Sequence, residues 1–384
     1  MERVEVVVVG AGPTGLTLGC ALRQAGIDVL VVDGAAEGAN TSRAAVVHAR
    51  TLEVLEQLDV TPRLLAEGCV VPVFTVRTGR RVLARIDFGG LPTPYPFTLM
   101  LPQSRTEALL SGRLTELGGQ VHRRCSVTAV RAGADGAEVS MTGPDGQSQQ
   151  VRARYVVGAD GMHSTVRGAA GIGFTGGRYP QSFVLADVRL DWSLPSDEVQ
   201  LFLAPAGLAV VAPLPGGHHR VVATADTAPD HADQPYLQML LDHRGPGRAQ
   251  VREVLWYSRF RVHHRVADTY RVGPLLLAGD AAHVHSPAGG QGMNTGIQDA
   301  ADLGVTLGQI LRDRAAPTTL DSYSRRRRPV AQRIVTLTDR ATRAATLTSP
   351  ITRTARDAAL TLAGRLPPIQ QRLPRQLAEL PADR

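Results

Sequence analysis

A glycine-rich segment near the N-terminus has the residue types and spacing of a phosphate-binding turn. Gly10, Gly12 and Gly15 follow an apolar run that predicts a buried strand and open a run that predicts a helix. One such glycine permits the tight bend, one lets the backbone approach a pyrophosphate, and one lets helix pack on strand. Asp33 would end the next strand, 18 residues after Gly15, where a carboxylate can bind ribose hydroxyls. The segment predicts dinucleotide binding without identifying the dinucleotide.

Two further segments repeat the pattern of a strand that runs into a turn containing glycine and aspartate. Residues 156–167 read as a strand, a turn around Asp160 and a short helix, and residues 275–283 read as a strand that ends in Gly-Asp at 279–280. A glycine-rich stretch at 289–296 then opens a long helix. Each segment alone predicts only a strand-to-helix turn with a capping aspartate. The three segments in this order are far more specific.

Together these segments resemble those of the flavoprotein aromatic monooxygenases that have the para-hydroxybenzoate hydroxylase fold. The resemblance covers residues 3–330 and includes Ser-Arg-Ala at 42–44, Arg-Thr-Leu-Glu at 50–53 and Leu-Pro-Gln-Ser-Arg-Thr-Glu at 101–107. These additional matches look most like the branch that oxidises polyketides and related antibiotics. The resemblance implies FAD as the cofactor, NADPH or NADH as a transient reductant, and O₂ as a co-substrate.

The resemblance also implies which residues contact FAD. The first glycine motif would bind the pyrophosphate, Asp33 the adenosine ribose, Val127 the adenine through its backbone, and Asp280 the ribityl or phosphate-side hydroxyls. Arg43 would lie near the pyrophosphate and the flavin, and Gln103 on the ribityl chain. Asp160 reads equally as a structural and as a cofactor-near residue. The full expected set is Gly10, Gly12, Pro13, Thr14, Gly15, Asp33, Arg43, Gln103, Val127, Asp160, Asp280, Pro287, Gly290, Gly292, Met293 and Asn294.

The turn at 290–294 has a physical reason to face the flavin ring. Reduced flavin is an anion, and a glycine-rich turn that opens a helix supplies N–H donors and the positive end of a helix dipole. The chain contains no lysine, so all 42 of its basic residues are arginine. This composition excludes Schiff-base lysines and the lysine of a P-loop. Stabilisation of the flavin anion by backbone N–H groups requires no lysine and is therefore compatible with this composition.

The positive charge of the chain belongs to its C-terminal part. From residue 325 onward there are 13 arginines and 4 acidic residues, whereas residues 1–324 are close to neutral. Nucleic-acid binding by the body of the protein is therefore disfavoured, although a non-catalytic protein that binds RNA or a membrane through this arginine-rich tail stays a remote alternative. No histidine or cysteine spacing predicts a metal site. The absence of a signal-peptide pattern and of a long apolar run predicts a cytoplasmic protein. We expect a monomer or a homodimer.

The order of elements predicts an α/β protein: a Rossmann-like FAD-binding domain with an inserted antiparallel β-sheet substrate domain and C-terminal helices. We expect the FAD-binding domain at 1–174 and 273–330, with interleaved substrate-side strands in 73–102. The β-sheet domain would span 175–272 and a helical tail 331–384. Four aromatic residues of the sheet layer are candidates for lining a substrate pocket, although some must belong to the core: Phe202, Tyr236, Trp256 and Tyr257.

These expectations combine into NAD(P)H-dependent hydroxylation of an aromatic, polyketide-like compound through a flavin C4a-hydroperoxide. No catalytic side chain is required, because the flavin carries the chemistry. Epoxidation or Baeyer–Villiger oxidation by the same oxidant is an open alternative, since the shape of the pocket selects the outcome. The sequence departs from the family after Asp299, where Asn-Leu-x-Trp-Lys is usual. The thioredoxin-like C-terminal domain of many relatives is expected to be absent or removed.

Overall fold

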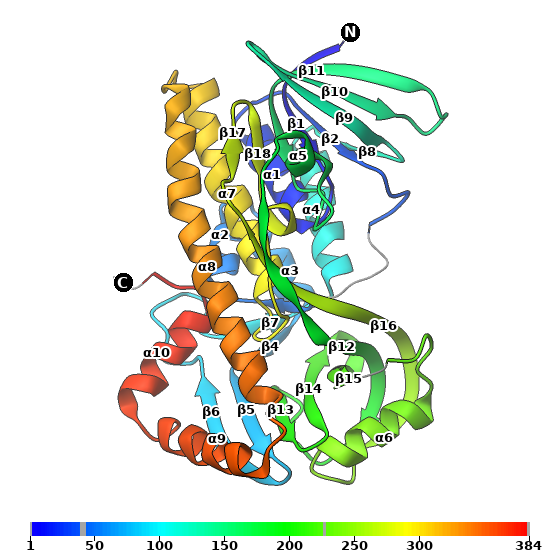
Figure 1. Ribbon diagram of the computed structural model, residues 1–384, viewed down its shortest axis with the longest axis vertical. Helices are drawn as coiled ribbons and strands as arrows, with labels where there is room; N and C mark the ends of the chain where they lie inside the picture. The colour runs from blue at the N-terminus through cyan, green and yellow to red at the C-terminus, as the bar shows by residue number, and fades with distance from the viewer. Residues whose placement is uncertain (1, 39–43, 226–227, 382–384) are drawn as a thin grey trace.

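The computed structural model of the chain describes residues 2–38, 44–225 and 228–381. Two sheets lie one above the other in Figure 1, and the long strands β12 (Phe174–Asp191) and β16 (Gln250–Ala267) run from the upper part of the molecule into the lower sheet. Helices α7 (Gln291–Leu311) and α8 (Leu320–Ala345) stand side by side along one edge. The mixed α/β fold class expected from the sequence is confirmed.

The upper sheet is built around the apolar N-terminal strand β1 (Glu2–Val9). Val6, Val7 and Val8 have no exposed surface, as a strand buried on both faces requires. The strand order is β17-β18-β11-β1-β2-β8, with all neighbours parallel except β17 and β18. A β9–β10 hairpin extends from β11. The remaining strands are β2 (Val29–Asp33), β8 (Val121–Arg123), β9 (Ser126–Gly133), β10 (Gly136–Thr142), β11 (Ser148–Gly158), β17 (Arg271–Val272) and β18 (Leu275–Leu277).

Helices cover the upper sheet and fix where its strands end. Helix α1 (Pro13–Gln24) packs against both α4 (Gln103–Glu116) and α7. Tyr323 of α8 is fully buried, and its hydroxyl donates to the Leu277 carbonyl oxygen at 2.9 Å, which ties α8 to β18. The smaller elements on this side are β3 (Val46–Val47), α2 (Ala49–Glu56), α3 (Thr61–Glu67), β4 (Cys69–Val71), β7 (Thr98–Met100) and α5 (Thr165–Ala169).

The lower sheet has the order β19-β16-β12-β15-β14-β13-β5-β6, antiparallel except where β13 pairs with β5. Helix α6 (Gln234–Arg244) covers one of its faces and buries Leu237 and Leu241 against strand residues such as Val184 and Val221. The other strands are β5 (Val73–Thr78), β6 (Arg81–Asp87), β13 (Glu198–Ala204), β14 (Gly207–Leu214), β15 (His218–Ala225) and β19 (His283–Val284).

The C-terminal part is helical, as its sequence pattern predicts. Helix α8 is followed by α9 (Pro350–Ala363) and α10 (Pro367–Leu377), and both contact β6 of the lower sheet. None of the helices in the described part of the chain combines the length and the apolar character needed to cross a bilayer.

Candidate functional site

The first glycine motif forms the turn between β1 and α1. Gly10 has φ = +103°, and a Cβ there would overlap the carbonyl oxygen of Ala159; a Cβ at Gly15 would overlap the carbonyl oxygen of Gly10. Both positions therefore need glycine for close backbone packing. Gly12 differs, because beyond its own chain neighbours a Cβ there would meet no atom within 4 Å. The backbone at Gly12 is open to a ligand, as a pyrophosphate site at a helix N-terminus requires.

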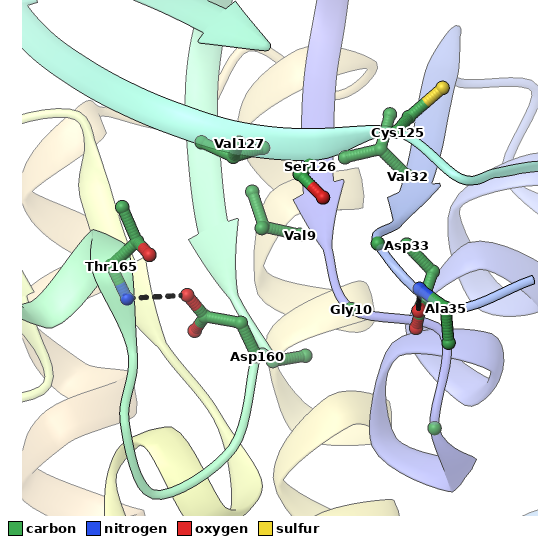
Figure 2. Close-up of a pocket in the computed structure, with 13 residues that line it drawn as sticks. Val9, Gly10, Val32, Asp33, Ala35, Cys125, Ser126, Val127, Asp160 and Thr165 are labelled. Atoms are coloured by element: carbon green, nitrogen blue, oxygen red, sulfur yellow. Dashed lines mark hydrogen bonds between the residues drawn. The ribbon is translucent and has the colours of Figure 1, made fainter. Parts of the chain in front are cut away.

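A cavity of about 360 Å³ lies beside this turn and brings together five of the residues expected at the cofactor. Gly10, Gly12, Asp33, Val127 and Asp160 all line it, although they come from four separate segments of the chain (Figure 2). The cavity sits at the ends of β1, β2 and β11, where ligands of open parallel sheets bind. The geometry fits the adenosine and pyrophosphate part of FAD.

Backbone groups hold the carboxylate of Asp33 at the end of β2. The N–H groups of Ala11 and Ala35 each donate to it at 2.7 Å, and Arg123 lies 3.7 Å from Oδ2. These contacts tie the end of β2 to the glycine turn. A carboxylate has more acceptor capacity than two N–H groups use, so it can still accept from ribose hydroxyls.

Asp160 caps a helix and also lines the cavity. Its Oδ2 accepts from the N–H groups of Thr165, at 2.7 Å, and Val166, at 3.3 Å, at the start of α5 (Figure 2). Its Oδ1 is buried and has no partner among the described residues. Both readings of Asp160 therefore have a structural basis: one oxygen is structural, and the other is available to a ligand.

Thr14, in the first glycine segment, lies against both the Gly-Asp turn and helix α7. A Cβ at Gly279 would lie 2.5 Å from Oγ1 of Thr14, and a Cβ at Gly296 would overlap the same atom. Gly279 also has φ = +61°. The Gly-Asp turn after β18 and helix α7 can approach α1 this closely only because both residues are glycine. Asp280, exposed in the turn after Gly279, is thereby held beside the start of α1.

The N-terminus of α7 is preceded by two glycines in the left-handed region, Gly289 and Gly290, with φ of +83° and +68°. No side chain caps this terminus through Gly290, so its first N–H groups lack a side-chain acceptor there. The Gly290 N–H donates to the Pro287 carbonyl oxygen at 2.9 Å, which closes the turn. A Cβ at Gly290 would lie 2.7 Å from the Cβ of Val46, so the turn packs on β3.

The side chain of Asn294 braces this turn. Its Oδ1 accepts from the His48 N–H at 2.8 Å, and its Nδ2 donates to the Val46 carbonyl oxygen at 2.9 Å. Met293 beside it is buried. Asn294 therefore attaches α7 to the segment that enters α2, and this attachment occupies both polar atoms of its side chain.

Gln103 lies beside the segment that begins at residue 44. Its Oε1 accepts from the Ala44 N–H at 3.3 Å, and its backbone N–H donates to the Ala44 carbonyl oxygen at 3.0 Å. Arg43, the neighbouring candidate, lies outside the described residues. Gln103 is thus positioned next to the segment that leads into β3.

A buried charge network next to the Gly-Asp turn was not expected from the sequence. Asp299 of α7 accepts from Nε of Arg327 at 2.6 Å and lies 2.6 Å from Nε2 of His283. Burial alone would raise the pKa of Asp299, but Arg327 and His283 together lower it below its usual value. Glu379, beyond α10, accepts from Gln298 at 2.7 Å, and burial raises its pKa to about 7. No local motif marks these residues, because they meet only through the packing of α7, α8 and the C-terminal segment.

The aromatic candidates for the substrate pocket lie on two different faces of the lower sheet. Phe202 is fully buried in the apolar cluster beneath α6, and Tyr236 and Tyr257 pack against that cluster. Trp256 neighbours Tyr257 and therefore points to the opposite face. There the guanidinium carbon of Arg220 lies 5.7 Å from the centre of its ring.

Arg220 connects this face to the segment that begins at residue 44. Its Nε and Nη2 donate to the two carboxylate oxygens of Asp187 at 2.7 and 2.8 Å, and its Nη1 donates to the Ala44 carbonyl oxygen at 2.9 Å. The sheet face that carries Trp256 and Arg220 is therefore turned toward the segment that leads into β3.

The described residues contain no group of three or more histidine, cysteine or acidic side chains placed to hold an ion. The FAD cofactor, in contrast, fits the residues present: open space at Gly12, an unpartnered acceptor on Asp160, and uncapped N–H groups at α7.

Comparison with curated proteins finds close relatives among oxygenases. The chain is 40% identical over 355 residues to 12-dehydrotetracycline 5-monooxygenase/anhydrotetracycline 6-monooxygenase of Streptomyces rimosus, covering 86% of this chain and 67% of that protein. It is 38% identical over 339 residues to rifampicin monooxygenase of Streptomyces venezuelae, covering 86% and 69%.

Solved structures show the same fold. p-Nitrophenol 4-monooxygenase from Pseudomonas putida superposes with a TM-score of 0.90 at 28% identity, with all of both chains covered. Aklavinone-11 hydroxylase, solved with FAD and aklavinone, gives a TM-score of 0.79 at 26% identity, covering 92% of this chain and 71% of that one. The model of the family described as "FAD binding domain" matches residues 3–338. FAD is the cofactor, and the chain belongs to the FAD-dependent aromatic monooxygenase family with the para-hydroxybenzoate hydroxylase fold.

Proposed function

We propose that this protein is an NAD(P)H-dependent monooxygenase that hydroxylates an aromatic, polyketide-like compound. The observation that carries the proposal is that Thr14 of the glycine turn lies against both Gly279 of the Gly-Asp turn and Gly296 of α7, so that the segments proposed to bind FAD pack together. The tetracycline and rifampicin substrates named for its relatives support a polycyclic aromatic substrate.

Within this proposal the bound FAD would supply the oxidising chemistry, with NADPH or NADH as the reductant and O₂ as the source of oxygen. The protein binds FAD through Gly10, Gly12 and Asp33, and uses the N–H groups of Gly292, Met293 and Asn294 to stabilise negative charge on the reduced ring. NADPH or NADH would bind transiently, since the sequence has no second glycine motif of this kind.

The substrate is proposed to lie between the flavin and the sheet face that carries Trp256 and Arg220. That face is turned toward residue 44 by the Arg220 contact.

We propose three domains: an FAD-binding domain at 1–174 and 273–330, a substrate domain at 175–272 joined by strands from 73–102, and a helical tail at 331–384. A cytoplasmic location and a monomeric or homodimeric state remain predictions.

The direct test is consumption of NADPH or NADH by the yellow protein with a panel of polyphenolic compounds, including anhydrotetracycline, and measurement of product mass. A gain of one oxygen with hydroxylated product supports the proposal. An epoxide or a ring-expanded lactone would instead identify the alternative reactions. A colourless protein that retains RNA at moderate salt would contradict the proposal.

Replacement of Asp280 by alanine tests the cofactor placement separately. Since Asp280 is proposed to bind hydroxyls of the ribityl or phosphate side, D280A should retain less FAD after purification and should bind it about tenfold more weakly, the effect of losing one charge-assisted hydrogen bond. Exposed Asp242 on α6 offers a control, because D242A should keep its full flavin content. Unchanged flavin in D280A would refute the placement.

A further inference from the structure

A short segment after α10 packs against the helices of the upper sheet. Helix α10 itself contacts β6 of the lower sheet, and the residues that follow it reach α2, where the Arg50 N–H donates to the Ala378 carbonyl oxygen at 3.2 Å (Figure 1). Ala378 is fully buried, and Leu380 is also buried. We call residues 377–380 the C-terminal strap. Because α10 is packed on one sheet and the strap on α2, this region connects the two parts of the molecule.

The strap holds the turn that precedes α7. Gln291, the buried first residue of α7, donates from its side-chain amide to the carbonyl oxygens of Leu377, at 3.0 Å, and Gly289, at 3.1 Å. The amide carries two hydrogens, so these two carbonyl oxygens use both of them. A Cβ at Gly289 would lie 3.2 Å from Cδ2 of Leu377, so the Leu377 side chain also rests on the turn. The strap and the turn are therefore joined by a hydrogen bond and by packing.

The strap also contacts α7 further along the helix, through Glu379. Its carboxylate accepts from Oγ1 of Thr295 at 3.2 Å and from Nε2 of Gln298 at 2.7 Å. Residues three apart in a helix lie on the same face, so both donors face the strap. The contacts of the strap thus cover the first two turns of α7.

The backbone conformation of Glu379 indicates that its side chain is needed. Its φ is +57°, and its N–H donates to the Gln376 carbonyl oxygen while the Leu380 N–H donates to the Arg375 carbonyl oxygen. Helix α10 therefore ends in a Schellman motif with Glu379 in the left-handed position, where glycine is usual because a Cβ is unfavourable. Glycine would suit this backbone better, but it could not contact α7.

We propose that the C-terminal strap positions the turn at 289–292 for the flavin ring of FAD, with Leu377 and Glu379 as positioning residues. The inference rests on the proposed function, in which the N–H groups at the start of α7 face the ring. The adenosine and pyrophosphate half of FAD fits the cavity beside Gly12, and none of the residues that the strap contacts in these ways lines that cavity. Loss of the strap contacts should therefore weaken binding of the flavin half and leave binding of the other half unchanged.

Two ligands separate these effects, FAD and ADP, because ADP carries only the adenosine and pyrophosphate half. E379G removes the carboxylate, whereas its backbone suits φ = +57°. Calorimetric titration of the flavin-free protein should show FAD binding about 3- to 10-fold weaker in E379G, the effect of losing one or two hydrogen bonds, with ADP binding unchanged. E379Q retains a side-chain oxygen that can accept from Gln298, so it should bind FAD nearly as wild type does.

Arg314 provides a matched control, because it is exposed and also has a left-handed backbone, with φ of +60°. R314G makes the same change of residue type in the same backbone conformation away from the strap. It should alter the affinity for neither ligand.

Truncation gives a second readout. A chain that ends at Gln376 lacks the whole strap and should bind FAD about tenfold more weakly or worse, with an unchanged affinity for ADP. The visible absorption of its bound flavin should move toward that of free FAD. A chain that ends at Pro381 keeps the strap and should match the full-length protein in all three measurements.

Two results would overturn the inference: wild-type FAD affinity in both E379G and the chain ending at Gln376, or equal losses of FAD and ADP affinity. Equal losses would mean that the strap only stabilises the fold in general. Failure of the proposed function looks different. A protein whose FAD affinity depends on the strap but which oxygenates no aromatic compound would contradict that function and leave the inference standing.

Discussion

Oδ2 of Asp299 lies 2.6 Å from Nε2 of His283, and neither side chain has exposed surface. The same carboxylate accepts from Nε of Arg327 at 2.6 Å and from the Gly279 N–H at 3.2 Å. One buried charge on α7 therefore fixes the Gly-Asp turn, the strand that leads to His285, and helix α8. The position of the Gly-Asp turn therefore depends on this carboxylate, although Asp299 is not among the residues expected to contact FAD.

Replacement of Asp299 by asparagine should strongly destabilise the protein. The substitution leaves the guanidinium of Arg327 buried without its counter-charge, so the free energy of unfolding should fall by about 3–5 kcal/mol. Urea unfolding followed by circular dichroism measures it. Asp302, one turn further along α7, pairs with Arg326 near the surface, so D302N should cost less than about 1 kcal/mol. Equal losses for the two variants would be evidence against the network.

The ionisation of Glu379 should make stability depend on pH. Burial raises its pKa to about 7, with Arg327 opposing that shift and Asp299 adding to it, whereas the carboxyl of an unfolded chain has its ordinary value of 4.5. A raised pKa means that the contribution is full below the unfolded value and is lost as pH rises through the folded value. E379Q cannot ionise, so relative to wild type it should gain up to about 3 kcal/mol in stability between about pH 5 and pH 8.

Glu67 provides the control for this measurement. The hydrogen bond from Arg105 lowers the pKa of its carboxyl, so the titration of Glu67 lies below the range tested. The stability difference between E67Q and wild type should therefore stay constant over that range. A constant difference for E379Q as well would show that Glu379 is already ionised at the lower pH.

The contact between Thr14 and Gly296 can be tested by a double-mutant cycle. G296A places a methyl group against Oγ1 of Thr14 and should lower stability by about 1–3 kcal/mol, as overpacking does. T14A removes the obstructing atoms, and its own Cβ lies 3.7 Å from the new methyl group. The double variant T14A/G296A should therefore recover most of the loss. Additive losses would mean that the two residues are not in contact.

The two faces of the lower sheet should respond differently to mutation. F202A empties a fully buried site beneath α6 and should reduce stability by about 3–5 kcal/mol with little effect on the KM for a substrate. W256A removes a half-buried ring from the opposite face and should raise that KM while leaving more of the stability intact. Steady-state kinetics and thermal unfolding separate the two effects. A raised KM in F202A with unchanged KM in W256A would reverse the assignment of the faces.

The sequence predicts most of what is local in this protein. The turns at Gly10, Gly12 and Gly15 depend on short-range backbone packing, so their spacing is readable directly. The faces of the lower sheet are not readable in this way. Trp256 and Tyr257 are neighbours with opposite environments, and an irregularity between Asp187 and Val188 shifts the pairing of β12 with β16. Only the register shows which aromatic side chain enters the core.

Long-range contacts account for the rest of what the sequence missed. Glu379 meets Thr295 and Gln298 across more than 80 positions of the chain. Asp299 and Arg327 are brought together by the packing of α7 on α8. Neither pair has a characteristic spacing, because their proximity follows from helix docking. Patterns of this kind become visible only when the fold is known.

The origin of the transferred oxygen tests the central claim most directly. The protein, loaded with FAD and supplied with NADPH, would be incubated with anhydrotetracycline, or with the best substrate from the panel, under ¹⁸O₂ in ordinary water. A monooxygenase that uses the flavin site described above should place one ¹⁸O atom in each product molecule. A product that takes its oxygen from water, or reduced O₂ released entirely as hydrogen peroxide with every aromatic compound tested, would contradict the account.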